Sequence, residues 1–309
     1  MMKHLQSDYC YQQIHIDAAR NATDDFNLFH DSKKWNRIHE NPFGMPIVLG
    51  FQLEALIESL VTRLRKDTGE DALISDHQLH YSNYQFTFAD VVCPGDSLSV
   101  EIKKTVNRIK ENSQLANRII MRKQEGLALI GFQRESAIPL CMPDEDFSGF
   151  GDLDTEQDRS WVVQDRYFMK RKFMNTGNGK NFLAGSLVDQ HDYFDELENR
   201  VQFPAMFPVA LLSCALLEKA RSEDYQFEAN PVVYTSHFIS VDRRLQENLK
   251  SNDRLCLLVG HAETVAAGTG LGRKGFTQQL YRCFGVLPGN RILFRAEVEM
   301  APLHELLQT

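Results

Sequence analysis

Residues 41–64 read NPFGMPIVLGFQLEALIESLVTRL. From Leu49 onward the apolar residues recur at the i, i+4, i+7 and i+8 spacing of an amphipathic helix. Pro46 stands just before this pattern, where its missing N–H costs little. The pattern predicts one long helix with one buried side. Its other faces carry the charged residues Glu54, Glu58 and Arg65.

A second stretch repeats this arrangement. The spacing from histidine to methionine is the same in both, from His30 to Met45 and from His191 to Met206, and each time a proline leads into a helical pattern. The second helix, over residues 209–217, is apolar nearly all round, so we expect it to be enclosed on most sides. This self-similarity indicates a chain built from two related halves.

Strand-like patterns follow each helix. They lie at residues 84–88, 98–102, 118–122 and 127–132, and again at 237–239, 255–259, 278–284 and 292–298. One more strand is expected before each helix, at residues 14–17 and at either 161–163 or 170–173. An antiparallel sheet buries a single helix only by curling around it. The sequence therefore predicts an α+β protein with a tandem (double) hot-dog fold, in which two antiparallel sheets each wrap around a long central helix.

An acidic segment lies near the middle of the chain. Residues 139–160 combine prolines and glycines with seven acidic residues, a composition that buries too little apolar surface to order itself. We therefore predict three parts: an N-terminal hot-dog half over residues 1–138, a solvated acidic linker over 139–160, and a C-terminal hot-dog half over 161–309.

Composition narrows the classes of function. The 309 residues are 43% hydrophobic and 25% charged, as in folded globular proteins. Lys plus Arg number 34 against 42 Asp plus Glu, a net charge of −8, so no nucleic-acid or membrane partner is expected. The six cysteines are scattered and none has the spacing of a zinc site, so we expect no metal. The N-terminus lacks the apolar stretch of a secretory signal, which predicts a cytoplasmic protein.

A short polar run precedes the first long helix. Asp25, Asn27 and His30 place a carboxylate, an amide and an imidazole within six residues of irregular chain. Gly50 stands in the first turn of the helix, where the N–H groups have no intrahelical acceptor and the helix end carries partial positive charge. A glycine there lets a carbonyl oxygen approach the backbone closely. The pattern predicts an acid/base pair beside a site that polarises a carbonyl group.

These residues resemble the motif of a known family. Asp25-Phe26-Asn27-Leu28-Phe29-His30 resembles the Asp-x-Asn-Pro-(Ile/Leu)-His signature of the MaoC-like dehydratases and (R)-specific enoyl-CoA hydratases, also called hydratase 2. The segment from Phe43 and Gly44 to Gly50 is similar to the family's approach to its central helix, and Pro94-Gly95-Asp96 resembles its Pro-Gly-Asp turn. The resemblance implies a lyase that hydrates 2-enoyl thioesters or dehydrates 3-hydroxyacyl thioesters of fatty acid metabolism, with an acyl-CoA or phosphopantetheine thioester as substrate and no cofactor.

The resemblance also implies roles for single residues. Asp25 would be the base that activates or receives water, and His30 its acid/base partner. Asn27, Gly50, Phe43 and Gly44 would form the substrate-binding part of the site. In the second half only the histidine of the motif is kept, since Ser186, Val188 and His191 stand at its positions. One active site per chain, in the N-terminal half, is therefore implied.

Alternatives to this enzyme remain open. The chain has Asp24 where the family has glycine, Leu28 where it has proline, and Leu49 where it has histidine. These differences favour a non-catalytic acyl-thioester-binding protein as one alternative, and a hot-dog acyl thioesterase is the other. An acyl-carrier protein is a candidate partner, and edge-to-edge pairing of hot-dog sheets makes a homodimer another expectation.

Two further segments have less specific patterns. Lys170-Arg171-Lys172 is the densest basic run and a candidate for contact with substrate phosphates, although a solvated strand face explains it more simply. Residues 268–275, GTGLGRKG, match the spacing of a dinucleotide-binding loop. The strand-like residues that follow them favour a hairpin loop instead.

Overall fold

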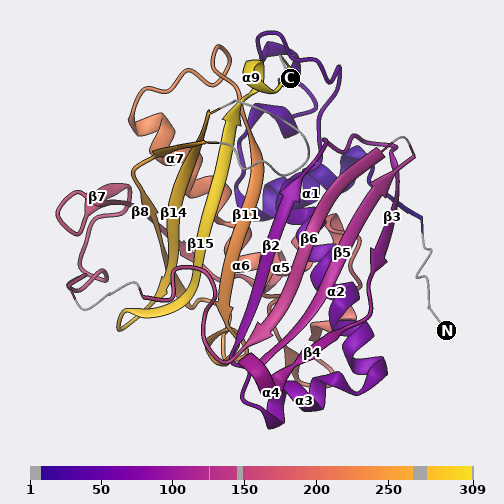
Figure 1. The fold of residues 1–309 in the computed structure, drawn as a ribbon. Helices are drawn as coiled ribbons and strands as arrows, with labels where there is room; N and C mark the ends of the chain where they lie inside the picture. Colours follow the sequence, from indigo (N-terminus) through magenta and orange to yellow (C-terminus); the bar gives the residue numbers. More distant parts are fainter. Residues whose placement is uncertain (1–7, 125, 145–148, 267–276, 308–309) are drawn as a thin grey trace.

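The computed structural model describes residues 8–124, 126–144, 149–266 and 277–307. Within these residues thirteen strands form one antiparallel sheet whose main path is β1-β3-β5-β6-β2-β11-β15-β14-β12-β8-β7 (Figure 1). The strands β4 and β13 pair with β5 and β14 off this path. The sheet curves around the helices, and the first half of the chain lies beside the second along it.

The first half contains the long central helix α2 and the strands that wrap it. Its elements are β1 (Tyr9–Cys10), α1 (Gln13–Thr23), the 3-10 turns η1 (Leu28–His30) and η2 (Trp35–Arg37), α2 (Gly50–Thr68), α3 (Glu70–Asp76), β2 (Tyr81–Phe88), β3 (Ser97–Ile102), β4 (Val106–Arg108), α4 (Ile109–Asn112), β5 (Gln114–Lys123) and β6 (Gly126–Ser136).

The second half has the same plan. Its elements are β7 (Ser160–Val162), β8 (Tyr167–Phe173), α5 (Thr176–Gly185), η3 (Gln190–Asp192), β9 (Phe194–Asp195), β10 (Arg200–Val201), α6 (Met206–Ala210), α7 (Leu212–Ser222), β11 (Val232–Asp242), α8 (Arg243–Gln246), β12 (Arg254–Gly260), β13 (Glu263–Ala266), β14 (Thr277–Leu287), β15 (Arg291–Pro302) and α9 (Leu303–Leu307). The strands β9 and β10 form a separate two-stranded pair. The predicted central helix is divided at Leu211 into α6 and α7.

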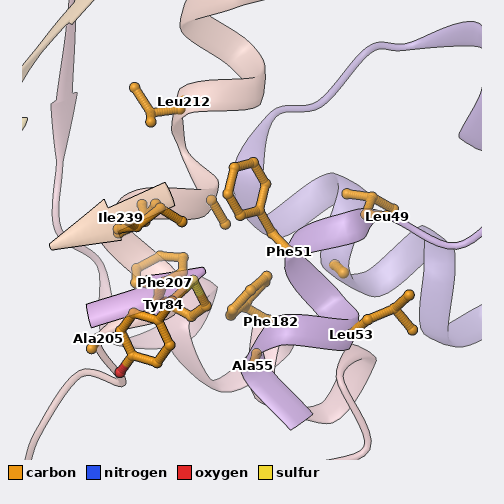
Figure 2. Packing of buried hydrophobic residues seen from close by; sticks show 14 of the residues in the cluster. Leu49, Phe51, Leu53, Ala55, Tyr84, Phe182, Ala205, Phe207, Leu212 and Ile239 are labelled. Carbon is orange, nitrogen blue, oxygen red and sulfur yellow. The ribbon is translucent and has the colours of Figure 1, made fainter. Parts of the chain in front are cut away.

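The two halves meet through β2 and β11. These strands pair antiparallel with Phe86 opposite His237 and Tyr84 opposite Ile239. The two sheets that the sequence predicts are therefore joined edge to edge into one. The hydrophobic core is likewise shared: Phe51 of α2, Phe182 of α5 and Phe207 of α6 belong to one cluster (Figure 2).

The burial of α2 differs from the prediction. The helix is buried on nearly every side from Phe51 to Val61, and the residues expected on exposed faces are buried too. Glu54 is 0% exposed, Glu58 6% and Arg65 3%. The apolar periodicity of α2 shows only the face that packs on the sheet of its own half. In the folded chain the second half covers the remaining face. Each of these charged groups has a buried polar partner, as described below.

Two other expectations are wrong. Residues 14–17 belong to helix α1, not to a strand, because Ile16, Ala19 and Ala22 form a buried stripe at helical spacing.

The segment 139–160 is not a purely solvated linker: Cys141, Phe150 and Leu153 are buried. Its apolar residues pack on the second half, and its acidic residues pair with bases of β8 and β12.

Candidate functional site

Asp25 lies in a turn that its neighbours hold in place. Helix α1 ends at Thr23, and Asp24 takes a left-handed conformation with φ of 53°. Asp25 is 4% exposed, its Oδ1 accepts a hydrogen bond from Asn27 N at 2.8 Å, and its carbonyl accepts one from Arg20 Nε at 3.0 Å. The turn directs the Asp25 carboxylate inward.

Asp24, which stands where the MaoC-like motif has glycine, adopts a backbone conformation that favours glycine. A glycine adopts the left-handed region without strain, and aspartate tolerates it better than most residues. The Asp24 carboxylate also forms an ion pair with Lys172 of β8, which ties this turn to the second half. An aspartate can therefore occupy this left-handed position.

His30 faces Asp25 from the end of η1. The His30 side chain is buried, and its Nδ1 lies 2.8 Å from the carbonyl oxygen of Ile47. Because that oxygen only accepts, Nδ1 carries the proton and the neutral ring presents Nε2 as an acceptor. Nε2 lies 3.9 Å from Asp25 Oδ2, too far for a direct hydrogen bond. A water or substrate hydroxyl between the two groups can contact both.

Burial also sets the charge of His30. Desolvation lowers the pKa of the imidazole, and the charge of Asp25 opposes this shift without cancelling it. We therefore expect a neutral ring at neutral pH, ready to accept a proton.

The N-terminus of α2 completes this part of the site. Gly50 is its first residue, and a Cβ added there would lie 2.9 Å from Cζ of Phe88. The preceding backbone is fixed, because Ile47 N donates to Phe29 O and Val48 N donates to Val92 O. The helix terminus and the acid/base pair are thus held on one rigid frame.

A cavity of about 270 Å³ brings the predicted residues together. Five of the six predicted site residues line it: Asp25, Asn27, His30, Phe43 and Gly50. Gly44 does not line it; this exposed glycine has a φ of 68° and supports the turn instead. The Asn27 side chain has a local task, since its Oδ1 accepts from Phe29 N at 3.1 Å and caps η1.

The second half supplies much of the cavity wall, as a degenerate half of a tandem hot-dog was expected to do, but the sequence did not indicate which of its residues would line the cavity. Tyr234 of β11 lines the cavity, and its hydroxyl lies 3.3 Å from Ser213 Oγ of α7. Burial raises the pKa of Tyr234, and the charge of Asp25 adds to this shift, so the phenol keeps its proton. No local motif marks this residue. Its place depends on the pairing of β11 with β2 across the chain.

The corresponding region of the second half is arranged differently. The His191 side chain is 71% exposed and its Nδ1 lies 3.0 Å from Asp189 Oδ1. The start of α6 is also occupied, since Ala205 N and Met206 N donate to the Glu58 carboxylate at 2.8 and 2.9 Å. A buried carboxylate of the first half thus takes the place that a ligand oxygen would need.

The basic run has structural partners. Lys170 Nζ lies 2.8 Å from Asp158 Oδ2, Arg171 NH2 donates to the carbonyl of Glu156, and Lys172 pairs with Asp24. The expectation of a solvated strand face is therefore wrong for Lys170 and Lys172, whose side chains are 9% and 11% exposed. Residues 268–275 lie outside the described residues.

The fold defines the protein as a double hot-dog, and comparison with known structures confirms this. A MaoC domain protein dehydratase from Chloroflexus aurantiacus J-10-fl superposes with a TM-score of 0.57 at 9% identity, covering 97% of this chain and 93% of that one. A conserved hypothetical protein of Mycobacterium tuberculosis, described as a double hotdog fold, gives 0.55 at 11% identity, with 96% and 94% covered. A further MaoC-like dehydratase gives 0.54 at 9% identity, with 97% and 96% covered.

Sequence comparison adds nothing to this likeness, because no family model and no curated protein matches the chain. At such low identity the structural neighbours establish the fold alone. Among the residues that the structure describes, no helix is both long and apolar enough to cross a membrane.

Proposed function

We propose that this protein hydrates 2-enoyl thioesters or dehydrates 3-hydroxyacyl thioesters, carried by coenzyme A or by an acyl-carrier protein. The observation that carries the proposal is the convergence of Asp25 Oδ2 and His30 Nε2, 3.9 Å apart, on one cavity beside the N-terminus of α2. Two proton acceptors at this separation suit a bound water or a 3-hydroxyl group. The proposal invokes no cofactor.

The chemistry follows from these groups. As the water oxygen bonds to C3 of the enoyl thioester, its proton passes to the Asp25–His30 pair, and the pair delivers a proton to C2. Dehydration is the reverse: the pair removes a proton from C2 and returns one to the departing 3-hydroxyl group. In both directions the pair begins and ends in the same protonation state.

The thioester carbonyl needs an electrophilic partner, because negative charge grows on its oxygen during the reaction. The first N–H groups of α2, beginning at Gly50, point out of the helix end and carry its positive partial charge. Donors of this kind typically contribute a factor of about 10²–10³ in rate. We therefore assign the carbonyl oxygen to the start of α2.

The proposal is tested with the purified full-length chain and crotonyl-CoA. Loss of the enoyl-thioester absorbance, with formation of 3-hydroxybutyryl-CoA, is the expected result. Release of free coenzyme A without hydration would instead show a thioesterase. Thermal stabilisation by crotonyl-CoA without any turnover would show a binding protein, and either outcome contradicts the proposal.

The Gly50 position predicts a steric effect. In Gly50→Ala the new methyl group would lie 2.9 Å from Phe88 Cζ, so either the ring or the helix start must move. A displacement of this kind can cost about 10²-fold in kcat/KM. Gly126→Ala is the matched control, because nothing lies within 4 Å of the Cβ it adds. Equal kcat/KM values for the two variants would show that the thioester carbonyl does not bind at Gly50.

The state of His30 predicts the acid limb of the pH profile. The reaction needs the neutral ring, and burial lowers the pKa of His30. Activity should therefore persist as the pH falls past about 6.5, the ordinary histidine value, and decline only below it. The measurement is kcat/KM for crotonyl-CoA as a function of pH. An acid limb above that value would contradict a buried neutral His30 as the reacting base.

A further inference from the structure

One end of the cavity differs chemically from the rest. The cavity extends along α7 from the region of Tyr234 to Lys219, and its lining between them is apolar, including Leu216 and Met300. At the far end stand Lys219, Glu223 and Tyr281. A cavity that served only a hydrocarbon chain would gain nothing from a buried ammonium group at this position.

Lys219 is held with its charge at this end. The residue is 4% exposed, and its Nζ lies 5.3 Å from the ring centroid of Trp161 and 5.7 Å from that of Tyr281. Cation–π contacts of this kind fix an ammonium group without neutralising it. The Tyr281 hydroxyl donates to Gln279 Oε1 at 2.9 Å, so the surrounding wall is polar as well.

The partner of Lys219 is replaceable. Glu223 contacts the ammonium with both oxygens, at 2.7 and 2.9 Å, but its side chain is 44% exposed. An i,i+4 pair whose carboxylate is open to solvent contributes little stability, because water solvates the carboxylate nearly as well. A carboxylate arriving through the cavity can take its place while Glu223 turns outward.

The length of the cavity sets the size of the ligand. Ser213, which contacts Tyr234 near the Asp25 end, precedes Lys219 by six residues of α7, a rise of about 9 Å. An extended chain advances about 1.2 Å per bond, so about seven bonds span this distance. In a thioester whose C3 lies at Asp25, the group that reaches Lys219 is attached near C10.

We propose that Lys219 binds an anionic group at the distal end of the acyl chain, which makes medium-length dicarboxylic acyl thioesters the preferred substrates. This assignment rests on the proposed hydro-lyase function. A terminal methyl group would leave Lys219 with Glu223 and gain nothing from the polar wall, whereas a terminal carboxylate forms a charge-assisted hydrogen bond with the ammonium. The phosphates of the thioester carrier are the other source of negative charge, and the test separates the two.

The main test compares two substrates of equal length, 2-decenoyl-CoA and its ω-carboxylate analogue 2-decenedioyl-CoA. We expect kcat/KM to favour the dicarboxylic substrate, and Lys219→Met to lower this ratio at least about tenfold, equivalent to about 1.4 kcal/mol. Lys219→Arg should retain part of the preference, and Glu223→Gln should increase it by removing the competing carboxylate. A ratio that is unchanged in Lys219→Met overturns the proposal.

A second comparison identifies the source of the charge. Crotonyl-CoA carries phosphates and crotonyl-pantetheine carries none. If Lys219→Met lowers kcat/KM for crotonyl-CoA and not for crotonyl-pantetheine, Lys219 binds a phosphate, and the assignment to the acyl end is overturned. The assignment to the acyl end predicts that kcat/KM stays unchanged for both thioesters, because a four-carbon acyl chain ends short of Lys219. Equal losses for both would mean that Lys219 acts without an anion at the acyl end, which also overturns the assignment.

A binding measurement keeps the inference separate from the proposed reaction. Decanoate and 1-decanol have the length of the acyl group, differ in whether one end is anionic, and need no turnover. Decanoate should raise the melting temperature of the protein more than 1-decanol does, and Lys219→Met should abolish the difference. Equal shifts in the unmodified protein would overturn the proposal. A preference for decanoate in a protein that turns over no enoyl thioester would refute the hydro-lyase function and leave the anion site standing.

Discussion

Replacing Asp25 with asparagine is expected to lower kcat/KM for crotonyl-CoA by about 10²–10⁴-fold, the range typical of a lost acid/base group. The amide keeps the shape of the side chain, and its oxygen can still accept from Asn27 N, as Asp25 Oδ1 does. What it loses is the ability to take up a proton. The melting temperature should therefore change little while turnover of the enoyl thioester falls.

Asp24→Asn is the matched control, because Asp24 adjoins Asp25 in sequence but its side chain is 67% exposed. Asparagine tolerates the left-handed backbone at this position at least as well as aspartate. We expect kcat/KM of this variant to stay close to that of the unmodified chain. If Asp24→Asn lowered kcat/KM as much as Asp25→Asn does, the negative charge of the turn would be what the reaction needs, and Asp25 would not be identified as the reacting carboxylate.

The partnership of Asp25 with His30 can be tested apart from either residue alone. Groups that act on one proton are strongly non-additive, so removing the second should cost little once the first is gone. The variant Asp25→Asn/His30→Ala should thus be about as impaired as the worse single variant. Fully multiplicative losses would show that the two residues serve independent steps.

The local part of the site could be predicted from the sequence because it is built from one short segment. Asp25, Asn27 and His30 lie within six residues, and Gly50 begins the helix that the same segment leads into. Their common cavity follows from this local path. The roles assigned to them remain predictions.

The residues that the second half contributes to the cavity could not be predicted in this way. Tyr234 and Lys219 reach the cavity only because β11 pairs with β2 and brings the second half against α2. The helical periodicity places Glu54 and Glu58 on faces that are exposed in an isolated half, whereas the fold covers those faces. The pairing of strands that lie far apart in the sequence depends on the whole chain, so a local sequence pattern does not predict it.

The buried polar residues of α2 share one feature: each contacts the second half or the sheet around the helix. Glu54 Oε1 lies 3.0 Å from His237 Nδ1, and Gln52 Nε2 donates to the carbonyl of Gly185 at 2.7 Å. Arg65 pairs with Glu135 of β6 and donates to Asn117. Buried pairs of this kind contribute little net stability but penalise any packing that separates the partners. The contacts of Glu54 and Gln52 therefore favour one alignment of the two halves, whereas those of Arg65 fix α2 against the sheet of its own half.

The buried Glu58 carboxyl group should make the stability of the protein depend on pH. The carboxyl group is buried, and desolvation raises its pKa from the usual 4.5 to about 7, although Met206 N and Ala205 N donate to it. The desolvation cost thus exceeds the gain from two hydrogen bonds. Between pH 4.5 and 7 the folded chain holds a proton at Glu58 that the unfolded chain has released, so stability falls as the pH rises through this window. The loss from this group is about 3 kcal/mol.

The variant Glu58→Gln isolates this effect, because glutamine does not titrate. Its free energy of unfolding, measured by urea denaturation, should lack the decline of about 3 kcal/mol that Glu58 causes between pH 4.5 and 7. The difference in stability between variant and unmodified chain should therefore shift in favour of the variant as the pH rises. Glu111→Gln, at an exposed position, should leave the pH profile unchanged. If Glu58→Gln also left it unchanged, the carboxylate would be charged at the start of α6, and hydrogen bonding to the two N–H groups would outweigh burial.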